Sequence, residues 1–333
     1  MQLVAYGAQD IYLTGNPQIT FFKVVYRRHT NFAMEAVEQT MNGTVAASAR
    51  TTATVSRNGD LVHDCFLKHT RASTTVVNES VSDIDNIEVS IGGQMIDRHY
   101  GHWMEVWAEL TENKTGRALG TNFQRTTGFG EQVATNESSA AADAATDTDV
   151  VHFTLTDQVS RVVYVPLFFW FCRNPGLALP LIALQYHEVK FIFNWSAAAN
   201  STDYTLWCNY VYLDTDERRR FAQVSHEYLI EQVQFQNQSS ATTHTLTFNH
   251  PVKELIWTGG ASNGVLTALT AGTTAQLKLN GHDRFSAQEH SYFTGYQVWK
   301  YHTGEGGLVH DSIAVYSFAL KPEEHQPSGT CNF

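Results

Sequence analysis

The longest apolar block of the chain spans residues 166–193 and is interrupted by proline and glycine. Pro175-Gly176 is typical of a turn, because proline presets φ and glycine tolerates a positive φ. Pro180 prevents a helix from continuing through the second half of the block. The block therefore predicts two buried strands joined by a tight turn. Its longest unbroken apolar run is far shorter than the ~20 residues that a membrane-spanning helix needs.

Short strand-like segments bounded by turn residues fill most of the remaining chain, which is typical of a sandwich or barrel. Strands are expected at 32–40, 61–67, 84–91, 151–165, 205–213, 228–235, 245–248, 252–257, 275–279 and 313–320. Arg57-Asn58-Gly59-Asp60 predicts a hairpin turn, since Asn-Gly favours type I′ geometry. Gly92-Gly93 predicts a second tight turn. The spacing of apolar residues from Met95 to Leu110 predicts a short helix, the clearest helical pattern in the chain.

The strand pattern divides the chain into four parts, and the fold class is all-β. Residues 1–30 are expected to form an N-terminal arm, which packs on its own domain or docks on a neighbouring subunit. Residues 31–213 are expected to form a first sandwich, 214–224 a polar and basic linker, and 225–333 a second sandwich. Within the first sandwich, residues 113–150 are rich in Thr, Ala, Ser, Asn and Gly and predict a long exposed loop.

Two strand-and-turn patterns of the first half recur in the second half. Gly281 lies in a strand–glycine–Asp-Arg pattern 188 positions after Gly93, and the strand at 252–257 resembles that at 61–66. Two matches at a similar offset indicate two copies of one β-architecture. By the same logic Tyr164-Val165 matches Val315-Tyr316, after which the second copy has fewer residues left than the first. We therefore expect the second sandwich to lack its final strands and to have an open edge.

Composition narrows the classes of function. The 333 residues are 43% hydrophobic and 17% charged, which suggests extensive burial against other chains, and the net charge of −11 argues against binding to a nucleic-acid backbone. Residues 217–220 (ERRR) are the local basic exception and are expected to be solvated. Four cysteines without CxxC spacing predict free, buried thiols in a reducing compartment. The start of the chain does not have the pattern of a signal peptide, so we expect the protein to be made and assembled in the cytosol.

Several long motifs resemble the major capsid proteins of nucleocytoplasmic large DNA viruses, in particular the phycodnavirus and mimivirus branch. They are 7–23 (GAQDIYLTGNPQITFFK), 26–33 (YRRHTNFA), 56–61 (SRNGDL), 175–189 (PGLALPLIALQYHEV), 221–223 (FAQ), 226–232 (HEYLIEQ), 316–322 (YSFALKP) and 326–333 (QPSGTCNF). The resemblance spans the whole chain.

This resemblance implies two consecutive eight-stranded jelly rolls, the second one C-terminally truncated. It implies a major capsid protein that forms homotrimeric, pseudo-hexagonal capsomers of an icosahedral capsid around an internal membrane. The expected partners are other copies, neighbouring capsomers and minor capsid proteins contacted through the N-terminal arm, without direct nucleic-acid contact. The expected location is the virion, and no catalytic residue, cofactor or metal is expected.

Candidate chemistry is sparse. His63, Cys65 and His69 would share one face of a strand, but no fourth ligand or usual zinc spacing accompanies them, so hydrogen-bonded or exposed histidines are expected. Asp97, Glu105 and Glu109 are expected to be solvated at a helix edge. The chain contains no GxSxG, P-loop or GxGxxG motif.

The chain contains seven N-x-S/T sequons, and we expect some exposed loop asparagine to carry sugar by a virus-directed route. The sequons lie at Asn42, Asn78, Asn113, Asn136, Asn194, Asn200 and Asn237.

Three alternatives to a major capsid protein remain. A minor capsid protein of the same fold differs in copy number. A carbohydrate-binding jelly roll would need an exposed aromatic platform, for which Trp103 and Trp107 are candidates, although we expect both in the core. A cupin-like enzyme would need a His-x-His with a downstream Glu and His, which we do not find.

Overall fold

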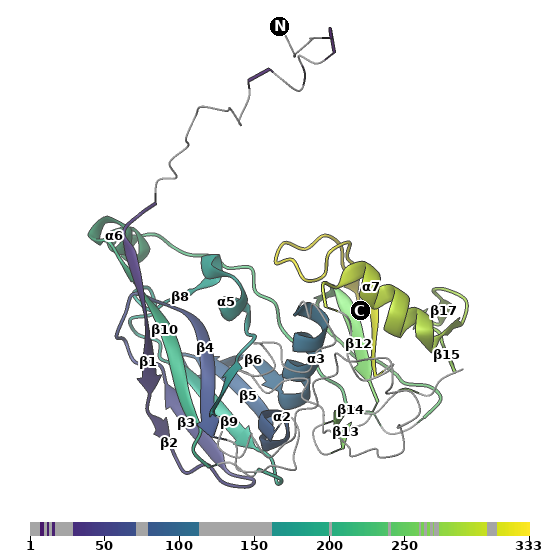
Figure 1. The fold of residues 1–333 in the computed structure, drawn as a ribbon, viewed down its shortest axis with the longest axis horizontal. Coiled ribbons are helices and arrows are strands. Elements are labelled where there is room, and N and C mark those ends of the chain that lie inside the picture. The colour runs from purple at the N-terminus through teal and green to yellow at the C-terminus, as the bar shows by residue number, and fades with distance from the viewer. Residues whose placement is uncertain are drawn as a thin grey trace, which may run out of the picture.

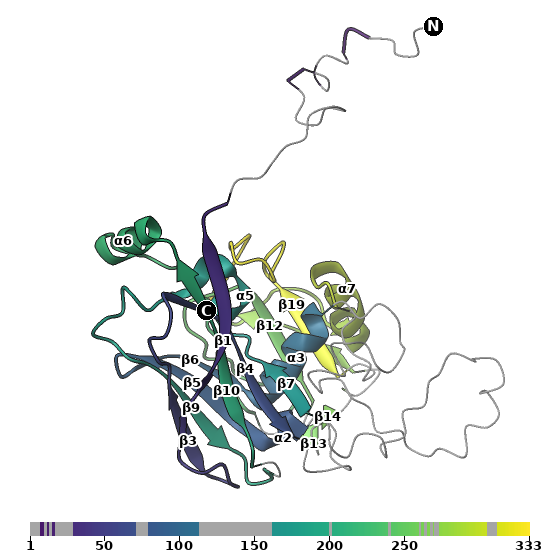
Figure 2. The ribbon, with the colours of Figure 1, turned by 60° about the vertical axis from the view of Figure 1, so that its left-hand side comes forward.

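A computed structural model describes the chain in two β-rich units that lie side by side (Figures 1 and 2). It describes residues 7–9, 12, 15–16, 29–70, 79–112, 162–199, 202–238, 241–259, 261–262, 265–266, 269, 273–304 and 312–333. Most of the predicted arm, the 113–150 loop and residues 151–161 of a predicted strand lie outside these ranges.

The first unit consists of two antiparallel sheets packed face to face. One sheet has the order β1 (Phe32–Gln39), β10 (Thr205–Leu213), β4 (Leu61–Thr70) and β7 (Val162–Pro166), and the short β8 (Leu179–Pro180) also pairs with β4. The other has the order β2 (Met41–Asn42), β3 (Arg50–Thr54), β9 (Val189–Trp195), β5 (Ile84–Ile91) and β6 (Gln94–Tyr100). Without the two-residue strands β2 and β8, each sheet has four strands, so the predicted eight-stranded jelly roll is confirmed for this unit.

Alternation along the strands builds the core between the two sheets. On β9, Val189, Phe191, Phe193 and Trp195 are all buried, while the residues between them are half-buried. Facing strands add further buried apolar side chains, including Leu67 of β4. The strands predicted at 32–40, 61–67, 84–91 and 205–213 are confirmed as β1, β4, β5 and β10.

The predicted helix from Met95 to Leu110 is correct only in its second half. Gly92 and Gly93 have φ of +61° and +85°, and the tight turn they form pairs β5 with β6. The hairpin therefore holds residues 94–100 extended, and helix α3 spans Gly101–Thr111. Gly101 is required at the helix start, since a Cβ there would lie 2.4 Å from the carbonyl oxygen of Val81.

The predicted hairpin at Arg57-Asp60 is wrong. β3 and β4, on either side of it, belong to different sheets, and among the described residues neither Asn58 nor Gly59 has a positive φ. Gly59 instead permits a close approach, because a Cβ there would lie 2.8 Å from Cβ of Tyr210. The glycine is explained by packing and not by turn type.

The apolar block at 166–193 does not form two strands joined by one turn. β7 ends at Pro166 and β9 begins at Val189. Between them lie the short helix α5 (Trp170–Arg173), the 3₁₀ turn η2 (Pro175–Leu177), β8 and a series of turns. Proline has no N–H to donate to a ladder of backbone hydrogen bonds, so the segment between β7 and β9 is largely irregular. Aromatic side chains of this segment are nevertheless buried in the core.

The second unit has short strands that pair two by two. The longest pair is β12 (Glu254–Thr258) with β19 (Ile313–Ser317). The other pairs are β11 (Pro251–Val252) with β20 (Cys331–Asn332), β13 (Ala261–Ser262) with β14 (Val265–Leu266), β15 (Thr274–Ala275) with β18 (Gln288–Glu289), and β16 (Lys278–Leu279) with β17 (His282–Asp283).

The predicted internal repeat is visible in the pairing. β12 pairs with β19 as β4 pairs with β7, and Asn280-Gly281 joins β16 to β17 as Gly92-Gly93 joins β5 to β6. Both residues of the second turn also have positive φ, 51° and 78°. The repeat extends to a helical segment that the sequence pattern does not predict: the π-helical η3 (Tyr292–Tyr296) and α7 (Gln297–Tyr301) occupy the place after β18 that α3 occupies after β6.

The strands predicted at 228–235 and 245–248 are wrong as regular sheet strands. The two segments are joined by glutamine side chains: Gln234 Nε2 donates to the carbonyl oxygen of Asn249, and Gln236 Nε2 to that of Thr245. The first segment also runs along β6, where the Val233 amide donates to Asp97 Oδ1 at 3.2 Å. Side chains here satisfy the backbone groups that a sheet ladder would otherwise pair.

The polar segment 214–224, which is expected to be a linker, contains the exposed helix α6 (Thr215–Gln223). Asp214 caps it by accepting from the Thr215 amide, and Asp216 and Glu217 lie in its first turn, where they favour the helix dipole. Arg218 Nη2 lies 3.0 Å from Oδ2 of the buried Asp60, which fixes the helix to the first unit. Of the three arginines, Arg218 therefore anchors the helix.

Candidate assembly surfaces

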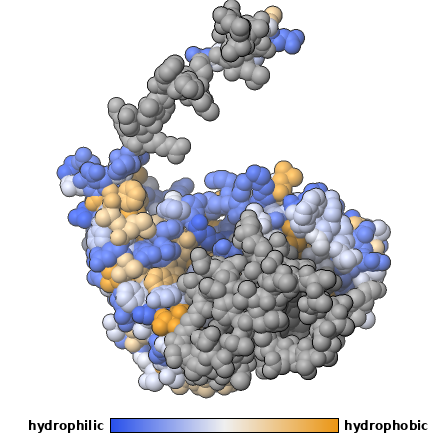
Figure 3. Space-filling model, in the orientation of Figure 1, coloured by the Kyte–Doolittle hydropathy of each residue, from blue (hydrophilic) through white to orange (hydrophobic). Residues whose placement is uncertain are grey.

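An apolar row crosses the outer face of the first unit, on the side of the sheet away from the core (Figure 2 shows its strands side by side). The register places Met34 opposite Val211, Trp207 opposite Phe66, and Lys68 opposite Tyr164. Met34 and Tyr164 are exposed to 51% and 40%. Figure 3 shows pale to orange apolar areas on the side of the molecule where β1 and β10 lie in Figure 1.

Aromatic contacts hold this row in a fixed shape. The ring of Phe66 stacks on that of Trp207, with 6.2 Å between centroids, and lies 5.9 Å from that of Tyr164. The Lys68 ammonium lies 5.7 Å from the centroid of the Trp207 ring. Pre-ordered aromatic side chains lose little conformational entropy on binding, so this row has the properties of a contact surface for another protein.

A second apolar contact joins the two units within one chain. Val106 and Leu110 of α3 form a buried cluster with Val298 of α7 and with Ile313 and Val315 of β19. The helix that ends the first hairpin thus also supplies core to the second unit, which Figure 1 shows beside it. This explains why α3 is buried over most of its length.

The two units also meet at backbone distance. The Gly304 amide donates to the carbonyl oxygen of Leu110 at 2.7 Å, and Thr303 Oγ1 donates to that of Thr111 at 2.9 Å. These bonds satisfy carbonyl groups at the end of α3 that the helix leaves unpaired. A Cβ on Gly304 would lie 2.4 Å from the carbonyl oxygen of Glu109, so the approach requires glycine.

A buried histidine lies next to this contact. Nε2 of His302 lies 3.0 Å from Oε2 of Glu254, and Nδ1 lies 3.0 Å from Oε1 of Glu323. Burial lowers the pKa of His302, but the hydrogen bonds and charges of the two carboxylates outweigh burial and raise it to about 9. His302 is therefore charged at neutral pH, and its two ion pairs link β12 to the segment that contains Glu323.

A charged chain links the aromatic block to the second unit. Arg173 of α5 lies over the Trp107 ring, 4.7 Å from its centroid, and pairs with Glu231. Lys253 also pairs with Glu231 and donates to the carbonyl oxygen of Glu324. Each cation thus has a carboxylate partner where the two units meet.

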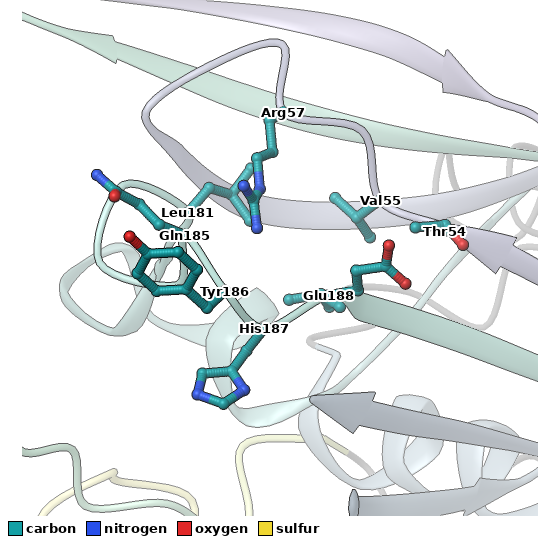
Figure 4. A pocket seen from close by; sticks show the side chains of 9 residues that line it. Thr54, Val55, Arg57, Leu181, Gln185, Tyr186, His187 and Glu188 are labelled. Atoms are coloured by element: carbon teal, nitrogen blue, oxygen red, sulfur yellow. The ribbon is translucent and has the colours of Figure 1, made fainter. Parts of the chain in front are cut away.

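A shallow surface hollow of about 390 Å³ lies near the turns before β9 (Figure 4). Arg57 Nη2 donates across it to the carbonyl oxygen of Leu184 at 2.8 Å, and Tyr186 is 92% exposed. Figure 4 shows Gln185 and His187 pointing away from each other, so they do not converge on a common point. The lining residues are Thr54, Val55, Arg57, Leu181, Gln185, Tyr186, His187, Glu188 and Val189.

The candidate metal ligands have separate partners. His63 Nδ1 lies 3.0 Å from the carbonyl oxygen of Phe171, His69 Nε2 lies 2.9 Å from Oγ of Ser80, and Cys65 contacts Cys208. Within the described parts of the chain, no group of three or more His, Cys, Asp or Glu could hold a metal ion.

The prediction that Asp97, Glu105 and Glu109 are solvated is wrong, since all three are buried. Asp97 Oδ2 lies 3.0 Å from Nε2 of His99, and its Oδ1 accepts from the amides of Arg98 and Val233. The second unit covers this side of α3 and β6. Burial by a distant part of the chain cannot be predicted from the local pattern of polar and apolar residues in one helix.

The aromatic and sequon residues fall in distinct environments. Trp107 is buried, as predicted, and Trp103 is half-buried with its ring 5.5 Å from that of Trp107. Asn42 and Asn237 are exposed. Asn194 is half-buried within β9 and donates to Asn86 Oδ1 at 2.7 Å. The other four sequons lie outside the described residues.

Comparison with known proteins decides the family. Residues 20–214 match the family described as "Major capsid protein N-terminus", and residues 217–333 match "Large eukaryotic DNA virus major capsid protein". The chain belongs to the major capsid protein family of large eukaryotic DNA viruses. Over its whole length it is 47% identical to a major capsid protein of Pyramimonas orientalis virus and 39% identical to one of Paramecium bursaria Chlorella virus 1, covering 88% and 84% of those proteins.

Two solved structures have the same fold as this chain. A chain of the PBCV-1 virus capsid matches with a TM-score of 0.72 and 35% identity, over 94% of this chain and 84% of that one. The Faustovirus major capsid protein matches with a TM-score of 0.60 at 13% identity, which shows the fold alone. The predicted double jelly roll is thereby confirmed. In the described part of this capsid protein, no helix is both long and apolar enough to cross a membrane.

Proposed function

We propose that this chain is the principal building block of an icosahedral virion and that three copies form a capsomer with a hexagonal outline. Two sandwiches in each chain place six similar units around one threefold axis. The domain boundaries that fit this assembly are 31–213 for the first jelly roll and 225–333 for the second, with 214–224 between them.

The observation that carries this proposal is the apolar row on the outer face of the first unit. Phe66, Trp207 and Tyr164 are held by mutual ring contacts on a face that the chain itself does not cover fully. Patches of ordered aromatic residues are typical of protein contacts. We assign this row to the contact between subunits.

The test is the oligomeric state of purified protein by light scattering after size exclusion. The wild type is expected to be a trimer. The double variant F66A/W207A should weaken association by about 30-fold or more, because truncating a central aromatic contact costs about 2 kcal/mol. Y186A, which removes a 92%-exposed ring elsewhere, is the matched control and should remain trimeric. A folded wild-type monomer would contradict the proposal.

Copy number distinguishes a principal subunit from a minor capsid protein of the same fold. Quantitative mass spectrometry of purified particles should find this chain as the most abundant structural protein. A few copies per particle would support the minor role instead.

The expected environment of the subunit follows from the same proposal. We propose assembly in the host cytoplasm, an N-terminal arm (residues 1–30) that contacts minor capsid proteins, and a lattice that surrounds an internal membrane. The net charge of −11 is consistent with a subunit that does not contact the genome. Cross-linking of particles followed by peptide mapping should connect the arm to minor proteins, and cross-links from the arm only to other copies would contradict this part.

We propose glycosylation at exposed sequons. Asn42 and Asn237 are exposed, whereas the Asn194 side chain is half-buried and hydrogen-bonded. Intact mass of virion-derived protein should exceed that of the chain, and peptide mapping should place sugar at Asn42 or Asn237. Sugar on Asn194, or an unmodified mass, would contradict it.

A further inference from the structure

Three of the four cysteines lie together in the core of the first unit. Cys65 of β4 and Cys208 of β10 are exposed to 1% and 0%, and their sulfur atoms are 3.3 Å apart. Cys172 of α5 is half-buried, packs against the same core, and is close enough to Cys65 to contribute, with Cys208, to the raised pKa of that thiol. Figure 1 shows α5 near β4 and β10, and α5 packs on β4. Among the described residues no group of three or more His, Cys, Asp or Glu could hold a metal ion, and this cluster is no exception.

The strand register places the two core thiols directly opposite each other. Cys65 and Cys208 are partners in the antiparallel ladder of β4 and β10. The carbonyl oxygen of Cys65 accepts from the Leu167 amide at 3.0 Å, on the side of β4 that faces β7. The N–H and C=O of one strand residue point to the same side, so Cys65 forms a non-hydrogen-bonded pair with Cys208.

This type of pair suits a cross-strand disulfide. Its Cα atoms are typically about 4.5 Å apart, and disulfides span Cα separations of about 4.4–6.8 Å. The sulfur atoms therefore need to close from 3.3 Å to about 2 Å without movement of the strands. A separation at the short end of this range makes the bond strained and easier to reduce.

We propose that Cys65 and Cys208 form a reversible disulfide under oxidising conditions, and that Cys172 is the thiol through which a small-molecule disulfide oxidises them. The Cys172 thiolate attacks the small disulfide, forms a mixed disulfide and releases one small thiol. The Cys65 thiolate attacks Cys172 Sγ, forms a Cys65–Cys172 bond and releases the second small thiol. The Cys208 thiolate attacks Cys65 Sγ and releases the Cys172 thiolate, which regains a proton.

The net reaction converts two protein thiols and one small disulfide into one protein disulfide and two small thiols. The route through Cys172 is needed because Cys65 and Cys208 are both buried, so a small-molecule disulfide in solution cannot reach either sulfur atom directly. A buried neutral thiol does not react with an oxidant in solution. Cys172 is the partly exposed member of the cluster and provides access to it.

The test uses the folded full chain, incubated with oxidised glutathione and then mapped by mass spectrometry without reduction. A Cys65–Cys208 peptide pair is the expected product, reversed by dithiothreitol. C172S should slow its formation by at least about tenfold, because oxidant access is lost. C331S is the matched control: Cys331 is half-buried on β20 of the second unit, and its removal should leave the rate unchanged.

Three results would overturn the proposal. The pair could stay reduced in the folded protein and oxidise only after denaturation. The stable product could be a Cys65–Cys172 bond. C172S could oxidise as fast as the wild type, with circular dichroism showing that it is folded. C208A, which keeps Cys65 and Cys172, should give only a mixed or Cys65–Cys172 disulfide.

Discussion

His302 carries its positive charge in the interior of the second unit, with one carboxylate on each ring nitrogen. Its side chain is fully buried, while those of Glu254 and Glu323 are exposed to 11% and 19%. A buried charge is stable only when it is paired. Here Nδ1 is hydrogen-bonded to Glu323, and Nε2 forms an ion pair with Glu254. Loss of the proton would leave two carboxylates facing a neutral ring.

The first prediction concerns the pH dependence of stability. The pKa of His302 rises from 6.5 unfolded to about 9 folded, so its stabilising effect is complete below about pH 6.5 and is lost as pH rises through 9. H302Q should reduce the free energy of unfolding by about 3 kcal/mol at pH 6 and by far less at pH 10. Urea unfolding of both proteins at these two pH values measures the difference.

H282Q is the control for this experiment, because His282 is an exposed histidine in the same unit. It should leave stability unchanged at both pH values. A constant deficit of H302Q from pH 6 to pH 10 would show that the residue contributes packing and not charge.

At the residue scale, sequence patterns predict strand alternation but not the partners of buried charges. Asp97 appears in the sequence as an ordinary polar residue of a helix edge, and its burial arises from His99 and the Val233 amide. Val233 is far along the chain, and nothing local to Asp97 encodes that contact. The same holds for Cys208, whose partner is 143 positions away.

Helix α3 is the element that connects the two sandwiches. It begins at Gly101, where the backbone approaches Val81 closely, and ends at Thr111, whose carbonyl oxygen accepts from Thr303. Its outer side supplies Val106 and Leu110 to a cluster with the second unit. One helix therefore completes the hairpin of one sandwich and the core of the next.

The second prediction tests this role. L110A removes a fully buried side chain and should lower the free energy of unfolding by about 2–5 kcal/mol. L320A, at a position that is 76% exposed, should change it by less than about 0.5 kcal/mol. Chemical denaturation gives both values, and equal effects of the two variants would refute the assignment of Leu110 to the core.

Two glycine-containing segments show why one predicted turn is correct and the other is wrong. Gly92-Gly93 forms the expected tight turn, because positive φ at both positions matches the twist of a hairpin. Asn58-Gly59 has the same local signature, but its glycine accommodates the Tyr210 side chain between two sheets. Close approach and turn geometry both select glycine, and only the three-dimensional contact distinguishes them.

The whole molecule consists of two related sandwiches fixed to each other at short backbone distances. Their equivalent helices, α3 and α7, meet in one apolar cluster, and Gly304 lies against the end of α3. Arg173 and Lys253 add charged contacts through Glu231. We expect the two units to unfold together for this reason.

The third prediction is that G304A separates them. A Cβ would lie within 2.5 Å of two carbonyl oxygens of α3, so the backbone must move. Calorimetry should show one transition for the wild type and two, or one broadened transition, for G304A. G295A is the control, since nothing lies within 4 Å of the added Cβ, and it should retain a single transition.

For the molecule as a whole, the sequence predicts much of the architecture. The recurrence of Gly93 at Gly281 correctly indicates two copies of one design, and the long motifs indicate the family. The regular strands predicted at 228–235 and 245–248 were wrong, because Gln234 and Gln236 link these segments through their side chains. Apolar alternation indicates which residues face inward and does not indicate what pairs with the backbone.

The helical seam has a mechanical consequence. With α3 inserted between the sandwiches and closed by Gly304, the protomer resists hinging about its own middle. Internal pressure on a capsid built from such subunits would therefore separate neighbouring subunits before it deformed any one of them. A capsid under stress should therefore break at the contacts between subunits, with each subunit remaining folded.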